Sequence, residues 1–217
     1  MRLWCLAWVG LEMMAGCRYQ YAPREAVPDE NLGMKMKKPK ADFEYMHDLL
    51  NGFFKMPNIR SALRVIQEQQ ITGWEIWFQV EFARFLSEHI SEPDWEREYA
   101  VEFDYRREKL GYFFKPDFII RKKHWPKDRY VALEIKQHIQ LGNCLTNMVA
   151  DLAKVAKIRK SQLDLRSIWA LGIFPYDPAI DVRAMIQDKL YGVGQPYHET
   201  RTATARIPRT KFSYALF

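Results

Sequence analysis

The sequence predicts an α/β fold in which a group of strands is flanked by helices. Apolar residues at helical spacing, together with cap and breaker residues, predict helices over residues 42–54, 58–70, 73–89 and 143–160. Alternating or continuous apolar runs predict strands over residues 96–105, 112–120, 130–136 and 167–174. From residue 73 onwards the order is therefore helix, three strands, helix, strand, and further helices precede it.

The first 41 residues are expected to form an accessory segment and a linker. Residues 1–16 are apolar, but Glu12 interrupts them and the run is short for an export signal. Residues 21–41 combine prolines with a run of lysines, which is the composition of a linker. Residues 42–217 are expected to form one domain, with its core at about residues 74–174.

The helix predicted at residues 73–89 carries the first candidate acids. Thr72 and Glu75 have the spacing of a capping box, so Glu75 is interpreted as a helix-start residue and not as a ligand. Glu81 falls inside an apolar stripe that includes Trp77 and Phe85. A buried carboxylate needs a partner, which leaves two alternatives for Glu81: a metal ion, or a neutralising Arg or Lys.

Two of the predicted strands carry charged residues on one face. Side chains alternate between the faces of a strand, so Asp117 is expected on one face of its strand, and Glu134 and Lys136 together on one face of theirs. The opposite, apolar faces are formed by Phe114, Phe118 and Ile120 in the first strand and by Val131, Leu133 and Ile135 in the second. If the strands pair, two carboxylates and one ammonium group converge, as in a metal site with a lysine beside it.

The spacing of Pro116-Asp117 and Glu134-Ile135-Lys136 resembles the PD-(D/E)XK nuclease superfamily. The resemblance covers about residues 74–174. It implies a restriction-endonuclease-like fold, which is a central mixed β-sheet flanked by helices with an αβββαβ core, here with an N-terminal helical extension.

The resemblance also implies a reaction and a role for each residue. Family members hydrolyse phosphodiester bonds with Mg²⁺ or Mn²⁺, and these cations prefer oxygen ligands. The side chains of Asp117 and Glu134 and the backbone carbonyl of Ile135 are then expected to bind the metal. Lys136 is expected to position the attacking water. Many members add an acid on the preceding helix, which makes Glu81 a further candidate for metal binding and catalysis.

Composition limits the class of protein. The net charge of +6 suits an anionic partner such as nucleic acid. The longest apolar runs are too short to cross a bilayer, so no membrane partner is expected. The three cysteines lack the spacing of a zinc site or a disulfide framework, which fits a reducing cytoplasm.

Several polar residues outside the acidic motif are candidates for contact with nucleic acid. They are Gln137, Lys154 and Lys157, and, in the basic loop 121–129, Lys122 and Lys123. Lysine binds phosphate without reading sequence. For Lys154 and Lys157 the alternative is a structural role, because the C-terminus of a helix favours cations. Trp125 of the same loop either stacks on a base or folds back onto its hairpin. The basic residues Arg201, Arg206, Arg209 and Lys211 suggest a loose basic tail.

These patterns favour a divalent-metal-dependent nuclease that acts on DNA, with RNA left open as a substrate. The alternative is a catalytically inactive nucleic-acid-binding or protein-interaction module on the same fold. A homodimer or a partner protein is compatible with either function.

Overall fold

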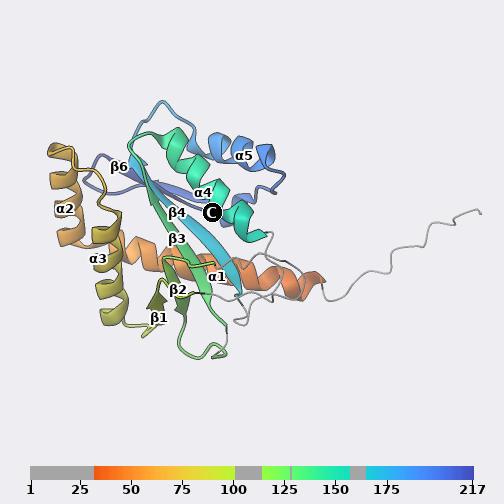
Figure 1. The fold of residues 1–217 in the computed structure, drawn as a ribbon. Helices are drawn as coiled ribbons and strands as arrows, with labels where there is room; N and C mark the ends of the chain where they lie inside the picture. The colour runs from red at the N-terminus through yellow and green to blue at the C-terminus, as the bar shows by residue number, and fades with distance from the viewer. Residues whose placement is uncertain (1–31, 101–113, 128, 157–164) are drawn as a thin grey trace, which may run out of the picture. The chain divides into compact units, whose positions relative to one another are not determined.

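A six-stranded mixed β-sheet forms the centre of the protein, with strands in the order β1-β2-β3-β4-β6-β5 (Figure 1). This computed structural model describes residues 32–100, 114–127, 129–156 and 165–217. The strands are β1 (Asp94–Arg97), β2 (Phe118–Arg121), β3 (Val131–Gln137), β4 (Ser167–Pro175), β5 (Ala203–Arg206) and β6 (Phe212–Leu216). The predicted α/β class is therefore confirmed.

The pairing directions place the two charged strands side by side. β1, β2 and β3 are antiparallel neighbours, β3 and β4 are parallel, and β6 is antiparallel to both β4 and β5. Phe118 pairs with Leu133, so the next position along the hairpin brings Asp117 level with Glu134. The register thus follows from burial of the apolar residues on the other face.

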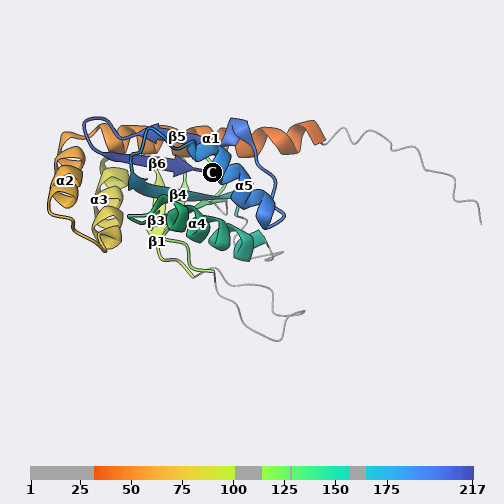
Figure 2. The same cartoon turned by 90° about the horizontal axis from the view of Figure 1, so that it is seen from above.

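Helices cover both faces of the sheet. They are α1 (Leu32–Lys55), α2 (Pro57–Glu68), α3 (Glu75–Glu88), α4 (Leu141–Ala156) and α5 (Val182–Gly192), with a short 3₁₀ helix at Glu199–Arg201. Figure 2 shows α1 on one side of the sheet and α4 on the other. The largest apolar cluster joins the first three helices to one face of β2, β3, β4 and β6, and a second cluster joins α4 and α5 to the opposite face. No helix in the described ranges has both the length and the apolar character needed to cross a membrane.

The structure corrects several predicted elements at the N-terminal side. α1 begins at Leu32 and runs through Pro39, inside the segment predicted as a linker. Pro57 is the first residue of α2, a position where proline costs no hydrogen bond. α3 begins at Glu75, and its N-cap residue Trp74 makes no side-chain cap bond, so the predicted capping box of Thr72 is wrong.

Two predictions for the strands also change. β1 occupies residues 94–97 and not 96–105, and residues 101–113 lie outside the described part of the chain. Phe114 was expected on the face of Phe118, but it packs with Ile119 and Ala132 on the opposite face. The regular strand starts only at Phe118, so the period of two does not extend back across Pro116.

The C-terminal residues are part of the sheet and not a loose basic tail. β6 lies between β4 and β5, and all of its residues are buried. Arg206 lies over the ring of Tyr176, 4.7 Å from its centroid, and donates to the carbonyl of Thr210. The sequence signal missed here is the apolar alternation within residues 212–217, which the nearby arginines obscured.

Candidate functional site

Asp117 lies just before β2, and three hydrogen bonds from different elements hold it. Its Oδ2 accepts from the backbone N–H of Ile135 at 2.6 Å, and its Oδ1 accepts from Nε2 of Gln79 on α3 at 2.7 Å. Its own carbonyl accepts from the backbone N–H of Glu98 at 3.2 Å. The carboxylate therefore has one fixed orientation beside β3.

Glu134 and Lys136 lie on β3, on the same face of the sheet, as the alternation of the strand predicts. The carboxylate of Glu134 is buried, and its Oε2 lies 3.4 Å from Nζ of Lys136. The same ammonium group lies 3.1 Å from Oδ2 of Asp151 on α4. Lys136 thus bridges an acid of the sheet and an acid of the helix that covers it, and Lys154 binds the other oxygen of Asp151 at 2.8 Å.

Glu75 joins this group from the first turn of α3. Asp117, Lys136 and Asp151 all act on it electrostatically, and the backbone of Gln137 is its hydrogen-bond partner. The sequence predicts Glu75 as a helix-start residue and does not place it among the acids of the site. A signal was present, because Glu75 and Gln79 are four residues apart and therefore lie on the same face of the helix.

Burial raises the pKa of three carboxyl groups in the site, those of Glu134, Asp117 and Glu75. The pKa of Glu134 rises to about 7, first because of burial and next because of the charge of Asp117. Burial also raises the pKa of Asp117, although the N–H of Ile135 and the charge of Lys136 oppose the change. The pKa of Glu75 is raised by burial and by Asp117, against the effect of Lys136. In this partly buried site, ionisation of one of the three carboxyl groups therefore makes ionisation of the others less favourable.

The charges around Lys136 work in the opposite direction. Burial alone lowers the pKa of this ammonium group, but the nearby carboxylates of Glu134 and Asp151 outweigh it, so the pKa of Lys136 is raised. Burial likewise opposes the ionisation of Asp151, yet the hydrogen bonds from Lys154 and Lys136 lower its pKa. Lys136 is therefore a firmly charged group in the middle of the acids.

Glu81 does not belong to this site, which corrects its prediction as a metal ligand and catalytic residue. Its Oε2 lies 2.6 Å from Nη2 of Arg84 and 3.5 Å from Nδ2 of Asn58. Two residues along an α-helix correspond to a rotation of about 200°, so Gln79 and Glu81 point to opposite sides of α3. The alternative of an ion pair with an arginine is confirmed for Glu81.

The donor set can be tested against a divalent cation. Among the described residues, no three His, Cys, Asp or Glu side chains form a complete metal-binding group. The side-chain donors near Lys136 are carboxylates, which suit hard cations such as Mg²⁺. Each carboxylate oxygen of Asp117 accepts one hydrogen bond and retains a lone pair. The chemistry of the donors fits Mg²⁺ or Mn²⁺, and Lys136 supplies the neutralising charge in the present arrangement.

The candidate nucleic-acid contacts fall into two groups. Gln137 and Lys154 lie beside the acidic group, at the end of β3 and on α4, whereas Lys157 lies outside the described residues. Lys122 and Lys123 lie at the opposite end of the β2–β3 hairpin. Lys123 pairs with Glu92, and Lys122 lies over the ring of Tyr45. These two lysines are therefore separated from Asp117 by the length of β2, roughly 13 Å.

Trp125 in the same hairpin loop folds back onto the protein. Its ring makes an edge contact with Tyr45, and the guanidinium group of Arg166 lies 4.1 Å from the ring centroid. Arg166 in turn pairs with the buried carboxylate of Asp42 on α1 at 2.6 Å. The loop tryptophan is thus part of the fold, and of the two alternatives for it the structure favours packing over base stacking.

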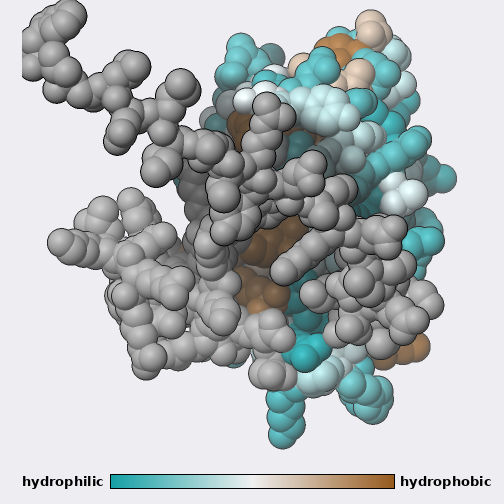
Figure 3. Space-filling model, turned by 90° about the vertical axis from the view of Figure 1, so that its right-hand side faces the viewer, coloured by the Kyte–Doolittle hydropathy of each residue, from teal (hydrophilic) through white to brown (hydrophobic). Residues whose placement is uncertain are grey.

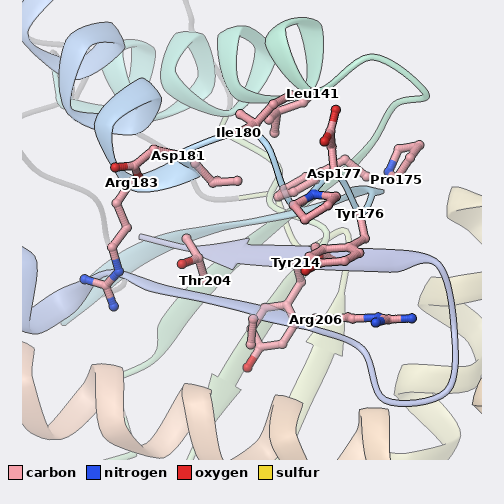
Figure 4. Close-up of a pocket in the computed structure, with 15 residues that line it drawn as sticks. Leu141, Pro175, Tyr176, Asp177, Ile180, Asp181, Arg183, Thr204, Arg206 and Tyr214 are labelled. Carbon is pink, nitrogen blue, oxygen red and sulfur yellow. The ribbon is translucent and has the colours of Figure 1, made fainter.

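The surface and one pocket are the other possible binding regions. The uncovered surface in Figure 3 is mainly hydrophilic, with a few apolar residues among the polar ones. A pocket of about 270 Å³ lies between the end of β4, the start of α5 and β5 (Figure 4). Its acids already have local roles, since Asp177 accepts from the N–H of Ala179 and Asp181 caps α5. The pocket contains none of the acids around Lys136.

Comparison with protein-family models, with curated proteins and with solved structures gives no match. The geometry of the site and the resemblance of its motif are therefore the features that point to a function.

Proposed function

We propose that this protein is a divalent-metal-dependent nuclease that hydrolyses phosphodiester bonds in DNA. The observation that carries the proposal is the meeting of Asp117, Glu134 and Lys136 at one end of the β2–β3 hairpin, where Asp117 binds the Ile135 N–H at 2.6 Å and Glu134 lies 3.4 Å from Lys136. This convergence of two acids and a lysine is what a PD-(D/E)XK site requires. The order α3-β1-β2-β3-α4-β4, with three antiparallel strands followed by a parallel crossover, supports a restriction-endonuclease-like core.

In this proposal each residue of the site has a distinct task. Asp117 and Glu134 bind the cation together with the carbonyl of Ile135, and Glu75 replaces Glu81 as the acid from the preceding helix. When bound, Mg²⁺ or Mn²⁺ would acidify water and neutralise charge on the phosphate. Lys136 holds the attacking water and the phosphate by charge and hydrogen bonding. Asp151 keeps the lysine next to Glu134.

The proposed nuclease can be tested on supercoiled plasmid DNA with Mg²⁺ or Mn²⁺. The wild-type chain should nick or degrade the plasmid, and Asp117→Ala or Lys136→Ala should reduce the rate at least about a hundredfold, because each removes a group that acts on the reacting phosphate or water. Glu75→Gln should also slow cleavage, whereas Glu81→Gln, on the opposite side of α3, should leave it unchanged. Cleavage that survives both Asp117→Ala and Lys136→Ala would show that this site is not responsible.

The second candidate function is a nucleic-acid-binding module without catalysis. One observation favours it: Lys136 bridges Glu134 and Asp151 and so offsets part of the negative charge that a bound cation would otherwise balance. Such a module would bind DNA in a salt-sensitive way, and its affinity would be the same in the presence of a chelator. It would not cut DNA, whichever divalent cation is added. The cleavage and binding assays together separate the two functions.

A further inference from the structure

Gln79 is a buried amide on the aromatic face of α3, and burial of such a group is unfavourable unless it is hydrogen-bonded. Only 2% of its surface is exposed. Both ends of the amide are bonded at 2.7 Å: Nε2 donates to Oδ1 of Asp117, and Oε1 accepts from Nη2 of Arg97 at the end of β1. The amide therefore connects an edge strand to the candidate metal ligand.

Arg97 fixes the direction in which this amide points. A guanidinium group can only donate hydrogen bonds, so the oxygen of Gln79 must face Arg97. The NH₂ group must then face Asp117, which accepts. The reverse orientation would place two donors together at Arg97 and two acceptors together at Asp117. Gln79 consequently has one favourable orientation.

The backbone contributes the other restraints on Asp117. The Ile135 N–H binds Oδ2, and the Glu98 N–H binds the main-chain carbonyl of Asp117. Glu98 directly follows Arg97, so the end of β1 holds Asp117 through its backbone and, by way of Gln79, through its side chain. Loss of Gln79 would remove the hydrogen bond to Oδ1 and leave the carboxylate held by the Ile135 N–H and by its side-chain hydrogen bond with Glu134.

We infer that Gln79, held by Arg97, is a positioning residue that orients the carboxylate of Asp117 for metal binding. This inference rests on the proposed function and adds a requirement to it: metal affinity depends on two residues that do not touch the metal. Outer-shell hydrogen bonds to metal ligands typically contribute tenfold to a hundredfold to affinity.

The test is calorimetric titration of the full chain with Mn²⁺ in the absence of DNA. Gln79→Met keeps the length of the side chain but removes both amide functions, and it should weaken Mn²⁺ binding about tenfold to a hundredfold. Arg97→Met should weaken binding in the wild-type background and add nothing in the Gln79→Met background, because Arg97 acts through Gln79. In cleavage assays Gln79→Met should lower kcat and leave the KM for DNA unchanged.

Leu86→Ala is the matched control for stability. Leu86 is buried on the same helix, so its truncation lowers the Tm without removing a hydrogen bond to Asp117, and it should leave the Mn²⁺ affinity unchanged. A Gln79→Met variant with a lowered Tm and a wild-type Mn²⁺ affinity would overturn the inference, since the amide would then be purely structural. If Gln79→Met does not fold, wild-type Mn²⁺ affinity in Arg97→Met overturns it equally. A wild-type chain that binds no Mn²⁺ would overturn the proposed function as well.

Discussion

The carboxyl group of Glu134 is buried beside other acids, so its ionisation lowers the free energy of unfolding. Its pKa is about 7 in the folded protein, against about 4.3 in an unfolded chain. Between about pH 4.3 and pH 7, the folded state therefore keeps a proton on Glu134 that the unfolded state has released. The stabilisation associated with this proton is fully present below about pH 4.3 and is lost as the pH rises through about 7.

Glu134→Gln should therefore stabilise the protein at high pH. Glutamine resembles the protonated acid and adds no charge next to Asp117, so the variant should have a higher Tm than wild type at pH 8, measured in chelator by thermal unfolding. A gain of 1 kcal/mol corresponds to about 2–4 °C for a chain of this size. At pH 5, where Glu134 is protonated in the folded state, the gain should become much smaller.

Glu88→Gln provides the comparison for this experiment, because Glu88 is an exposed residue of α3. Its effect on the Tm should be small and nearly the same at both pH values. If Glu134→Gln lowers the Tm at pH 8, the ion pair of Glu134 with Lys136 outweighs the repulsion between the carboxylates, and the electrostatic description of the site is wrong.

At the scale of residues, the sequence predicted the parts of the site that lie on strands. Alternation and an apolar row determine which way Glu134 and Lys136 point, and the register then brings Asp117 beside them. The helix residues could not be assigned in this way. The rotation of α3 about its axis and the approach of α4 depend on packing between distant segments. Asp151 therefore had no signal in the local pattern, and the four-residue spacing of Glu75 and Gln79 could not show that this pair lies beside the strands.

At the scale of elements, α4 reaches the sheet because β4 has no side chain at Gly172. Gly172 pairs with Lys136 across the parallel strands. A Cβ atom at this position would lie 2.3 Å from Sδ of Met148 and 3.0 Å from Sγ of Cys144, both on α4. Asp151 follows on the same helix, so the seating of α4 also determines how close this acid lies to Lys136.

Gly172→Ala should consequently disturb both the fold and the site. The added methyl group must displace Met148, which should cost about 1–3 kcal/mol of unfolding free energy as overpacking does elsewhere. It should also weaken the contact between Asp151 and Lys136. Denaturant unfolding measures the first effect, and the rate of DNA cleavage with Mg²⁺ measures the second.

Gly142→Ala is the matched control, because a Cβ atom at this position of α4 has no neighbour within 4 Å. The control should unfold at the same or a slightly higher denaturant concentration, since alanine favours helix. Equal stability of Gly172→Ala and wild type would mean that Met148 repacks freely and that α4 is not held at this distance by the glycine.

The predicted elements succeeded where a segment's own pattern decides its structure and failed where packing decides it. β3 and β4 follow the predicted segments closely, and α4 agrees with the prediction over residues 143–156, while residues 157–160 lie outside the described part of the chain. α1 instead continues through Pro39, although proline removes a helical hydrogen bond. Further along this helix, the buried carboxylate of Asp42 forms an ion pair with Arg166, which directly precedes β4 and lies 124 residues later in the sequence. Such long-range contacts override local composition.

At the scale of the whole compact unit, which spans Asn31–Phe217, the C-terminal hairpin completes the sheet. β6 pairs with β4 from Leu171 to Pro175, and β5 pairs with β6 on its other side. The hydroxyl of Tyr214 donates to Oδ1 of Asn51 at 2.9 Å and lies 3.2 Å from Nε2 of His47, both on α1. The last strand in sequence thus connects the centre of the sheet to the first helix.

Deletion of residues 203–217 should therefore abolish cooperative folding. It would leave one edge of β4 without hydrogen-bond partners and remove the buried side chains of β6 from the core. Thermal unfolding followed by circular dichroism should show a broad, weak transition in place of a sharp one.

Arg209→Gly is the control in the same segment. Arg209 has a φ of 62°, which glycine adopts without strain, so this variant should keep the wild-type Tm or exceed it slightly. A truncated chain that unfolds cooperatively at the wild-type Tm would mean that the hairpin is dispensable, as expected for the loose tail that its arginines suggested.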